Sequence, residues 1–414
     1  MTDAARRDVF RIPGFLAFWT AYTVSGFGSY VTTLALQVIV LLTLNGTAAD
    51  VGLLNGARWL PYLALGLVVG ALVDRRRRKP VMIGTDLARA AVLAVIPVLY
   101  LLDRLTVPIL IVFVVFFGLF SLFGDAAAQS FLPRVVPTTD LLAAHARTDQ
   151  SDAVAQTTGP VVAGGLVGLV GAPFAVVVDA VSYLFSAIAI WRIRTVEPDP
   201  APREARGLRR EIGEGLRWVY RHPLLTPMAI GSHGWFLFNS VLGTVYVPFA
   251  LLALHLSAVE LGITLAAAGL AALLGSSIST RTGLRWGAGR AVIASNLVMT
   301  VGWAVIALVP AASTAVTIGV LALGQALYGL GLGLSNANEM GYRQSITPDR
   351  LQGRMNTTIR SANRAMIVIG APIGGLLAVS IGYRPTLWIA IVGFLLVAGF
   401  LAASPFRRAR HGDD

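Results

Sequence analysis

The sequence has no cysteine, so disulfide bonds and thiolate metal sites are both excluded. Its five histidines are scattered along the chain and form no metal-binding pattern. No Gly-x-x-x-x-Gly-Lys-Ser/Thr segment is present, which excludes an ATPase motor built on a phosphate-binding loop of that type. We therefore expect a protein that is not an enzyme and has neither a metal site nor a resident cofactor.

Charged residues are also scarce. They make up 13% of the 414 residues, whereas soluble proteins average about 25%, and 56% of the residues are hydrophobic. A helix needs about 20 mostly apolar residues to cross a hydrocarbon core of about 30 Å. The composition therefore predicts an all-α membrane protein with twelve transmembrane helices. The expected spans are residues 15–42, 51–73, 81–102, 107–128, 149–170, 174–191, 226–252, 261–280, 291–311, 315–336, 356–380 and 386–403.

The distribution of basic residues predicts an orientation. A net charge of +12 would suggest a nucleic-acid ligand in a soluble protein, but here the arginines lie in alternate loops. With both termini in the cytoplasm, 27 of the 33 Lys and Arg residues fall in cytoplasmic segments, and the opposite loops hold only Arg104 and Arg384. Because positive charge collects on the cytoplasmic side, we expect both termini there, a bilayer as partner and no nucleic acid.

The predicted helices fall into two sets of six. A polar interruption separates a bundle at residues 1–191 from a bundle at residues 224–414, and the linker at residues 192–223 combines an extended stretch with an amphipathic helix. Three pairs of residues lie 211 positions apart in the two halves: Pro137 and Pro348, Gly159 and Gly370, and Gly171 and Gly382. Two parallel six-helix repeats are typical of a carrier that rocks around a site at the bilayer midplane.

The loop between the second and third expected helices carries a recognisable pattern. It reads Gly-Ala-Leu-Val-Asp-Arg-Arg-Arg-Arg-Lys over residues 70–79, with Gly70, Asp74, Arg75, Arg78 and Lys79 at the spacing of a known signature. This pattern resembles the loop signature of the major facilitator superfamily. The resemblance implies the fold of that superfamily and a loop that helps to switch between conformations.

The physical roles in this loop follow from its residue types. Gly70 lets another helix approach closely, and Asp74 can meet the positive N-terminal end of a helix in the other half. Arg77 departs from the signature, because the superfamily usually has glycine at that position. The alternative is that Asp74 and the arginines simply form a loop that obeys the positive-inside rule.

The fifth expected helix contains Gly159, Pro160 and Gly164. These residues resemble the glycine and proline signature of exporters in the same superfamily, since small residues permit close packing and proline permits a bend. Ordinary small-residue packing is the alternative. Residues 131–137, 214–223 and 344–354 also look like the bacterial exporter branch that includes enterobactin exporters and macrolide-efflux proteins.

Ionised side chains within the spans are candidates for a role in transport. Inserting one near the bilayer centre costs at least about 2.5–3.5 kcal/mol of free energy, so each needs a partner, a watery cavity or a function. Asp125 and Glu339, at the inner ends of the fourth and tenth helices, are the candidate proton or cation sites. The alternative is that the cytoplasm solvates both. Residues 118–125 lack the arginine of many proton antiporters of the superfamily, so family proton chemistry does not carry over at that position.

Other polar residues give candidates for substrate binding. Arg58 and Arg364 lie inside predicted helices, and Arg364 is placed to attract an anionic substrate or to form a structural pair. His233 and Asn239 are expected to join Tyr30 and Gln37 in a polar and aromatic cavity wall, or else to serve in helix packing. Four further residues are expected to be structural: Asp86, Arg89, Asp152 and Asp179.

We therefore predict a secondary active transporter of the bacterial cytoplasmic membrane, functional as a monomer. The resemblance implies export of a small amphipathic molecule such as a drug, an antibiotic or a siderophore by alternating access. The proton gradient is the expected energy source, through antiport. The alternatives are an importer or uniporter of the same fold and a non-transporting membrane receptor.

Overall fold

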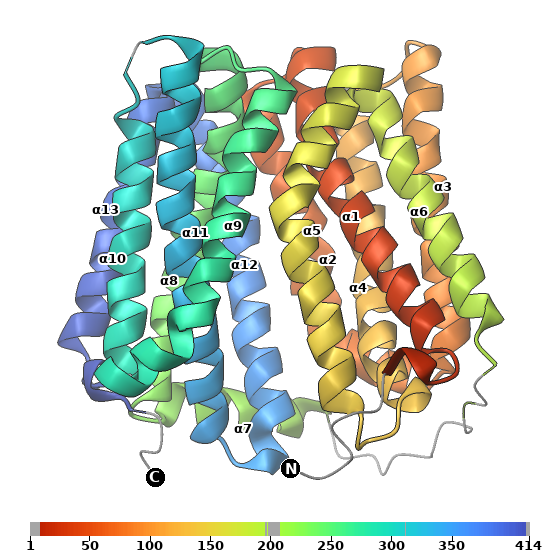
Figure 1. The fold of residues 1–414 in the computed structure, drawn as a ribbon, viewed down its shortest axis with the longest axis vertical. Coiled ribbons are helices and arrows are strands. Elements are labelled where there is room, and N and C mark those ends of the chain that lie inside the picture. The colour runs from red at the N-terminus through yellow and green to blue at the C-terminus, as the bar shows by residue number, and fades with distance from the viewer. Residues whose placement is uncertain (1–8, 195–196, 198–207, 311, 411–414) are drawn as a thin grey trace. The chain divides into compact units, whose positions relative to one another are not determined.

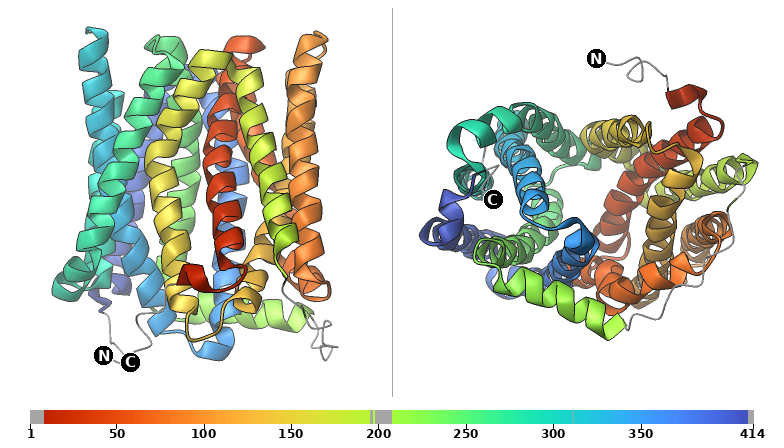
Figure 2. Two further views of the ribbon diagram at one scale, coloured as in Figure 1. Left: turned by 45° about the vertical axis from the view of Figure 1, so that its right-hand side comes forward. Right: turned by 90° about the horizontal axis from the view of Figure 1, so that it is seen from below.

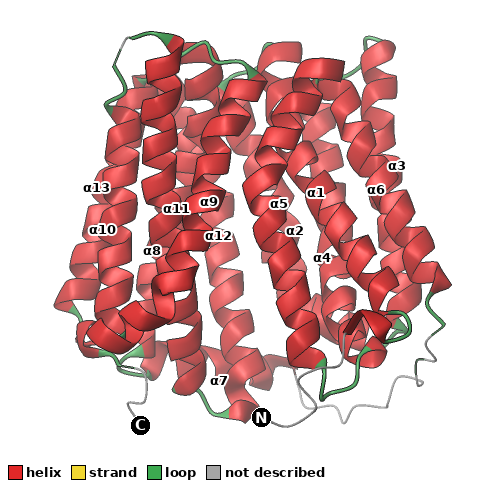
Figure 3. Ribbon diagram, viewed as in Figure 1, coloured by secondary structure: helices red, strands yellow, loops and turns green. Residues whose placement is uncertain are grey.

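The computed structural model describes residues 9–194, 197, 208–310 and 312–410, apart from the side chains of residues 67, 71, 74, 208 and 209. The extended stretch of the expected 192–223 linker, at residues 197–202, therefore lies outside the described residues except for Glu197. The described part of the chain is helical and contains no β-strand (Figure 3). This confirms an all-α protein.

The helices follow the apolar segments of the sequence. Those of the first half are η2 (Val9–Arg11), α1 (Phe15–Val38), η3 (Ile39–Thr43), α2 (Ala48–Asp74), α3 (Arg78–Leu101), α4 (Val107–Val135), α5 (Leu141–Val170) and α6 (Ala172–Arg192). They are followed by α7 (Leu208–Arg221), α8 (Leu225–Pro248), η4 (Phe249–Ala253), α9 (Ala258–Trp286), α10 (Ala288–Ala307), α11 (Thr314–Ser345), α12 (Asp349–Ile381), α13 (Tyr383–Ala403) and η5 (Pro405–Arg408).

Within the described residues, 11 helices are long and apolar enough to cross a membrane. They include α1 with its continuation η3, and α8 with its continuation η4. The second expected span falls in α2, a continuous helix of 27 residues that is not among the 11. These helices have the length and composition of a multi-pass membrane protein, while twelve spans in two six-helix bundles stay a prediction.

The chain divides into two compact units, which share α2 between them. Unit 1 comprises residues 1–44 and 64–204, and unit 2 comprises residues 45–63 and 205–414. In unit 1, α1 packs against α5 and α6, and α3 packs against α4 and α6 (Figure 1). In unit 2, α11 packs against α9 and α10, and α8 packs against α12 and α13.

Local features recur along the chain at nearly the spacing of the sequence repeat. The π-helical turns η3 and η4 begin at Ile39 and Phe249, which are 210 residues apart. Left-handed backbone follows each turn, at Asn45 with φ of 51° and at His255 with φ of 55°. These equivalent turns support descent of the two halves from one repeated unit.

The amphipathic helix α7 belongs to unit 2. It packs against α12 and α8, at the end of the unit where α12 begins (Figure 2). Val219 is buried in a core cluster with residues of α8, α11, α12 and α13. Arg354 of α12 pairs with Glu211 at 3.6 Å and also with Glu214. Apolar burial and ion pairing together fix this helix to α12.

The joint between α7 and α8 depends on a histidine. The Nδ1 atom of His222 accepts hydrogen bonds from the backbone N–H groups of Leu224, at 3.3 Å, and Leu225, at 3.2 Å. These bonds satisfy donors at the start of α8 that have no intrahelical partner. Burial lowers the pKa of His222 below its ordinary value of 6.5, which favours the neutral ring needed for this acceptor role.

We expect this joint to loosen in acid. Because the folded pKa of His222 is lowered, its stabilising contribution is complete above about pH 6.5 and is lost as the pH falls through the folded value. Amide exchange at Leu224 and Leu225, corrected for its intrinsic pH dependence, should rise at about pH 5 relative to pH 7.5. His222→Asn keeps an acceptor that does not titrate, so its exchange should not change. Equal pH dependence in both proteins would contradict this assignment.

Candidate functional site

A cavity of about 180 Å³ lies inside unit 1, between α1, α3, α4, α5 and α6. Four charged side chains line it: Asp86 and Arg89 from α3, Asp125 from α4, and Asp152 from α5. Three carboxylates and one guanidinium give this set a formal charge of −2. Hydroxyl groups from α1 and α6 complete the polar lining. We call these four residues the carboxylate cluster.

Asp86 and Arg89 form the buried part of the cluster. Their spacing of three residues brings both side chains to one face of α3, where they form a salt bridge. Only 4% of the Asp86 side chain is exposed, and Ser186 of α6 donates a second hydrogen bond to this carboxylate at 2.7 Å. The expected structural pairing of Asp86 with Arg89 is therefore present.

The guanidinium of Arg89 is enclosed from two further sides. It lies over the ring of Tyr183, 4.2 Å from the ring centroid. Its Nη2 atom lies 3.0 Å from where a Cβ on Gly124 would stand, so glycine at this position makes room for it. A cation held by a carboxylate and an aromatic face can remain charged inside an apolar helix bundle.

Asp125 and Asp152 form the open part of the cluster, since both are exposed. Asp125 interacts electrostatically with both Asp86 and Arg89. Asp152 accepts a hydrogen bond of 2.7 Å from the hydroxyl of Tyr22 on α1. The cluster therefore leads from accessible carboxylates to a buried ion pair, which is an arrangement that can accept a proton or an organic cation.

Sequence reasoning identified only Asp125 in this cluster. The sequence favours structural roles for Asp86, Arg89 and Asp152, because each has a local explanation as an ion pair or as an acid near the start of a helix. The sequence signal was the presence of charge within apolar segments. The packing of five helices that brings these residues to one cavity could not be predicted from the sequence.

The loop signature is described only in part. Gly70 is exposed, and no described atom lies within 4 Å of where its Cβ would stand. Asp74 ends α2, but its side chain lies outside the described side chains. Arg75 follows in the turn and is exposed, while Arg78 is buried at the start of α3. The expected roles of Gly70 and Asp74 stay predictions.

Glu197, which the sequence placed in the linker, caps α3. Its two carboxylate oxygens accept hydrogen bonds from the backbone N–H groups of Arg78 and Lys79, each at 2.7 Å. The Lys79 ammonium donates to the carbonyl oxygen of Ile193 at 2.7 Å. The first turn of α3 holds no acid and its N-cap residue is Arg77, so the favourable anion must come from another segment.

The helix-five residues lie at the contact between α5 and α1. Gly159 faces Tyr30, since a Cβ on this glycine would stand 2.8 Å from the Cγ atom of the ring. Pro160 and Gly164 are buried in the same helix. The equivalent glycine of the other half, Gly370, is as closely approached by α8, where Leu237 O would be 2.5 Å away. Close packing at these positions agrees with the role expected for small residues.

The remaining candidates lie in unit 2 and have partners there. Arg364 lies over the ring of Trp59 at 3.7 Å, and Arg58 lies 5.9 Å from the same ring. Glu339 is 4.0 Å from Arg343, one turn along α11. Asn239 accepts a hydrogen bond of 2.9 Å from Tyr328.

His233 connects three helices of unit 2. Its Nδ1 atom lies 2.6 Å from Asn363 Oδ1 on α12, and its Nε2 atom lies 2.8 Å from the hydroxyl of Tyr220 on α7. Both ring nitrogens are therefore occupied by protein groups.

Comparison with known proteins gives a match over nearly the whole chain. The family described as transmembrane secretion effector matches residues 6–413. The chain is 26% identical over 378 residues to the enterobactin exporter EntS of Citrobacter koseri, a match that covers 88% of this chain and 82% of that protein. It is 30% identical over 228 residues to the multidrug efflux pump Tap of Mycolicibacterium fortuitum, and spans about half of that relative, 55% of its length.

Solved structures show the same fold at low identity. A bacterial homologue of the human lysosomal transporter Spinster, in an inward-facing and unoccupied conformation, superposes with a TM-score of 0.72 at 15% identity, and the match covers 94% of this chain and 95% of that one. A bacterial homologue of the iron transporter ferroportin, in an inward-facing state, superposes with a TM-score of 0.72 at 14% identity. This match covers 93% of this chain and 98% of that one.

Proposed function

Because the chain belongs to the transmembrane secretion effector family of the major facilitator superfamily, we propose that it exports small amphipathic molecules in exchange for protons. Drugs, antibiotics and siderophores are the cargo classes under this proposal, since relatives include a multidrug efflux pump, a macrolide efflux protein and an enterobactin exporter. Both termini then lie in the cytoplasm of a bacterium, and bundles at residues 1–191 and 224–414, joined by the linker at 192–223, alternate access between the two sides.

The observation that carries the proposal is the carboxylate cluster. Its formal charge of −2 attracts protons and cationic groups, while the aromatic rings of Tyr22 and Tyr183 offer apolar surface beside the charge. Asp125 and Asp152 are both accessible to water, and we assign the coupling role to Asp125 because Asp152 accepts a hydrogen bond from Tyr22. A cargo cation and a proton compete for the same carboxylates.

Competition of this kind can couple the movement of cargo to the movement of protons. When the cargo leaves the cavity, the vacant carboxylates take up protons. When another cargo molecule binds, it displaces these protons. Exchange then follows if the cavity opens to one side of the membrane at a time and changes sides only when its charge is compensated. The Asp86–Arg89 salt bridge carries no net charge, so the formal charge of −2 belongs to Asp125 and Asp152.

The direction of flux tests this function. Everted membrane vesicles from an efflux-deficient host that express the protein should accumulate a cargo from a panel of ethidium, a macrolide and a catecholate siderophore when respiration acidifies their lumen. A protonophore should abolish the accumulation. An importer would deplete the lumen under the same conditions, and a receptor would leave the flux of every compound at the level of the empty-vector vesicles.

A further inference from the structure

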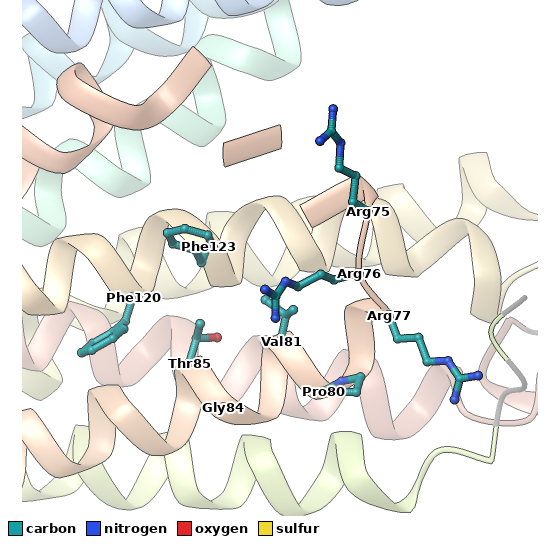
Figure 4. Close-up of a pocket in the computed structure, with 9 residues that line it drawn as sticks. All are labelled: Arg75, Arg76, Arg77, Pro80, Val81, Gly84, Thr85, Phe120 and Phe123. Atoms are coloured by element: carbon teal, nitrogen blue, oxygen red, sulfur yellow. The ribbon is translucent and has the colours of Figure 1, made fainter. Parts of the chain in front are cut away.

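A second cavity in unit 1 is lined by residues of α3 and α4 other than those that line the carboxylate cluster. Its volume is about 550 Å³, within the range of about 300–1,000 Å³ typical of ligand pockets. The loop from Arg75 to Arg77, the first turns of α3 and part of α4 line it (Figure 4). Thr85 borders this cavity, whereas its neighbour Asp86 borders the cluster.

The mouth of this cavity is basic. In Figure 4 the side chain of Arg76 reaches back over Val81, while Arg75 and Arg77 extend away from it in different directions. Arg75, Arg76 and Arg77 are all exposed. For Arg75 and Arg76, no side-chain hydrogen bond or ion pair to any other described residue is present. The guanidinium of Arg76 is therefore available to an anion at the edge of the cavity.

The floor of the cavity is apolar. Phe120 and Phe123 of α4 face Val81 and Gly84 of α3 across it (Figure 4). Gly84 is exposed, and no described atom lies within 4 Å of where its Cβ would stand, so the space above it is open. A soluble anion gains nothing from such a floor, whereas a hydrocarbon chain does.

The cavity also has the depth expected of a lipid site. Thr85 lies seven residues after Arg78, the first residue of α3, which corresponds to about 10 Å along the helix. Both α3 and α4 are long and apolar enough to span the membrane. The charged mouth therefore stands at the end of a span, and the aromatic floor reaches into it.

We propose that this cavity binds one anionic phospholipid of the bilayer. Arg76 binds the phosphate of the headgroup, and the upper part of one acyl chain lies against Phe120 and Phe123. The site is separate from the proposed cargo and proton site and does not depend on transport.

The test is lipid binding to the purified full-length protein, measured by native mass spectrometry during titration with phosphatidylglycerol or phosphatidylcholine of the same acyl chains. The wild-type protein should bind a single phosphatidylglycerol molecule at this site. Its affinity for phosphatidylglycerol should be higher than its affinity for phosphatidylcholine. Arg76→Gln should weaken phosphatidylglycerol binding roughly fivefold, as expected for one arginine near an anionic headgroup, and should leave phosphatidylcholine unchanged. Gly84→Leu should weaken both lipids, because the new side chain fills the place of the acyl chain.

Matched controls are available on other helices. Arg407→Gln removes an exposed arginine of η5, and Gly399→Leu adds a side chain on α13 where no described atom lies within 4 Å of the Cβ position. Neither should change binding. The proposal is overturned if Gly84→Leu leaves phosphatidylglycerol binding unchanged, which would show charge attraction without a cavity. It is equally overturned if inorganic phosphate displaces the lipid, or if Arg76→Gln and Arg407→Gln have the same effect.

Discussion

Replacement of Asp125 by asparagine is expected to abolish proton-driven accumulation of cargo while counterflow of cargo continues. A gradient of one pH unit is worth about 1.4 kcal/mol per proton, enough for roughly tenfold accumulation in a one-for-one exchange. Asparagine keeps the shape and polarity of the side chain but cannot bind or release a proton in this range. The variant should therefore equilibrate cargo and lose the whole of that tenfold excess, measured in everted vesicles and in counterflow assays.

Asp125 is a sharper target than its neighbour Asp86. Asp86→Asn would leave Arg89 without its paired carboxylate in a buried site, which costs about 3–5 kcal/mol and confuses stability with coupling. The matched control is Asp103→Asn in the loop between α3 and α4, where φ is +53° and asparagine is well tolerated. Full accumulation by the Asp125 variant, or equal loss in the Asp103 variant, would remove Asp125 from the coupling mechanism.

A single methyl group at Gly159 is expected to destabilise unit 1. The Cβ of Gly159→Ala would lie 2.8–3.0 Å from the Cβ, Cγ and Cδ2 atoms of Tyr30, which are close to the backbone of α1 and cannot move aside easily. Overpacking of this kind costs about 1–3 kcal/mol. The apparent Tm of the purified protein should fall by roughly 2–10 °C, and export should fall with it if α5 moves against α1.

Two comparisons separate the clash from other effects of alanine. Gly165→Ala makes the same change on the same helix, but no described atom lies within 4 Å of its Cβ position. Its stability should be unchanged or slightly raised, because alanine favours helix by about 1 kcal/mol over glycine. Tyr30→Ala removes the Cγ and Cδ2 contacts but keeps the Cβ contact, so it should relieve part of the clash. The double variant should therefore be more stable than the sum of the single effects indicates. Additive losses would contradict a contact at Gly159.

The long apolar runs predicted the helices well, because bilayer thickness sets their length. The ends were less accurate. The fifth expected helix was placed at residues 149–170, whereas α5 covers Leu141–Val170, since its first turns are polar and lie beyond the apolar run. Helix α2 was expected as an ordinary span, yet the two compact units share it.

The site was less predictable than the fold. Asp125 stood out as a charge in an apolar segment, but Asp152 lies 27 residues further along and joins it only through the packing of α4 and α5 around α1 and α3. In the same way His233 was identified as a candidate, but its partners Tyr220 and Asn363 are 13 and 130 residues away. Contacts of this kind depend on how helices pack, which residue periodicity does not specify.

Proton movement driven by cargo tests the central claim most directly. Purified protein is reconstituted in liposomes that contain a pH-sensitive dye, and a gradient of its best cargo from the panel is imposed. Protons should then move in the direction opposite to the flow of cargo, without any other energy source. The same measurement on Asp125→Asn should show cargo movement with no proton movement. If the wild type moves cargo without protons, or if the Asp125 variant moves protons as the wild type does, the carboxylate cluster does not couple the two.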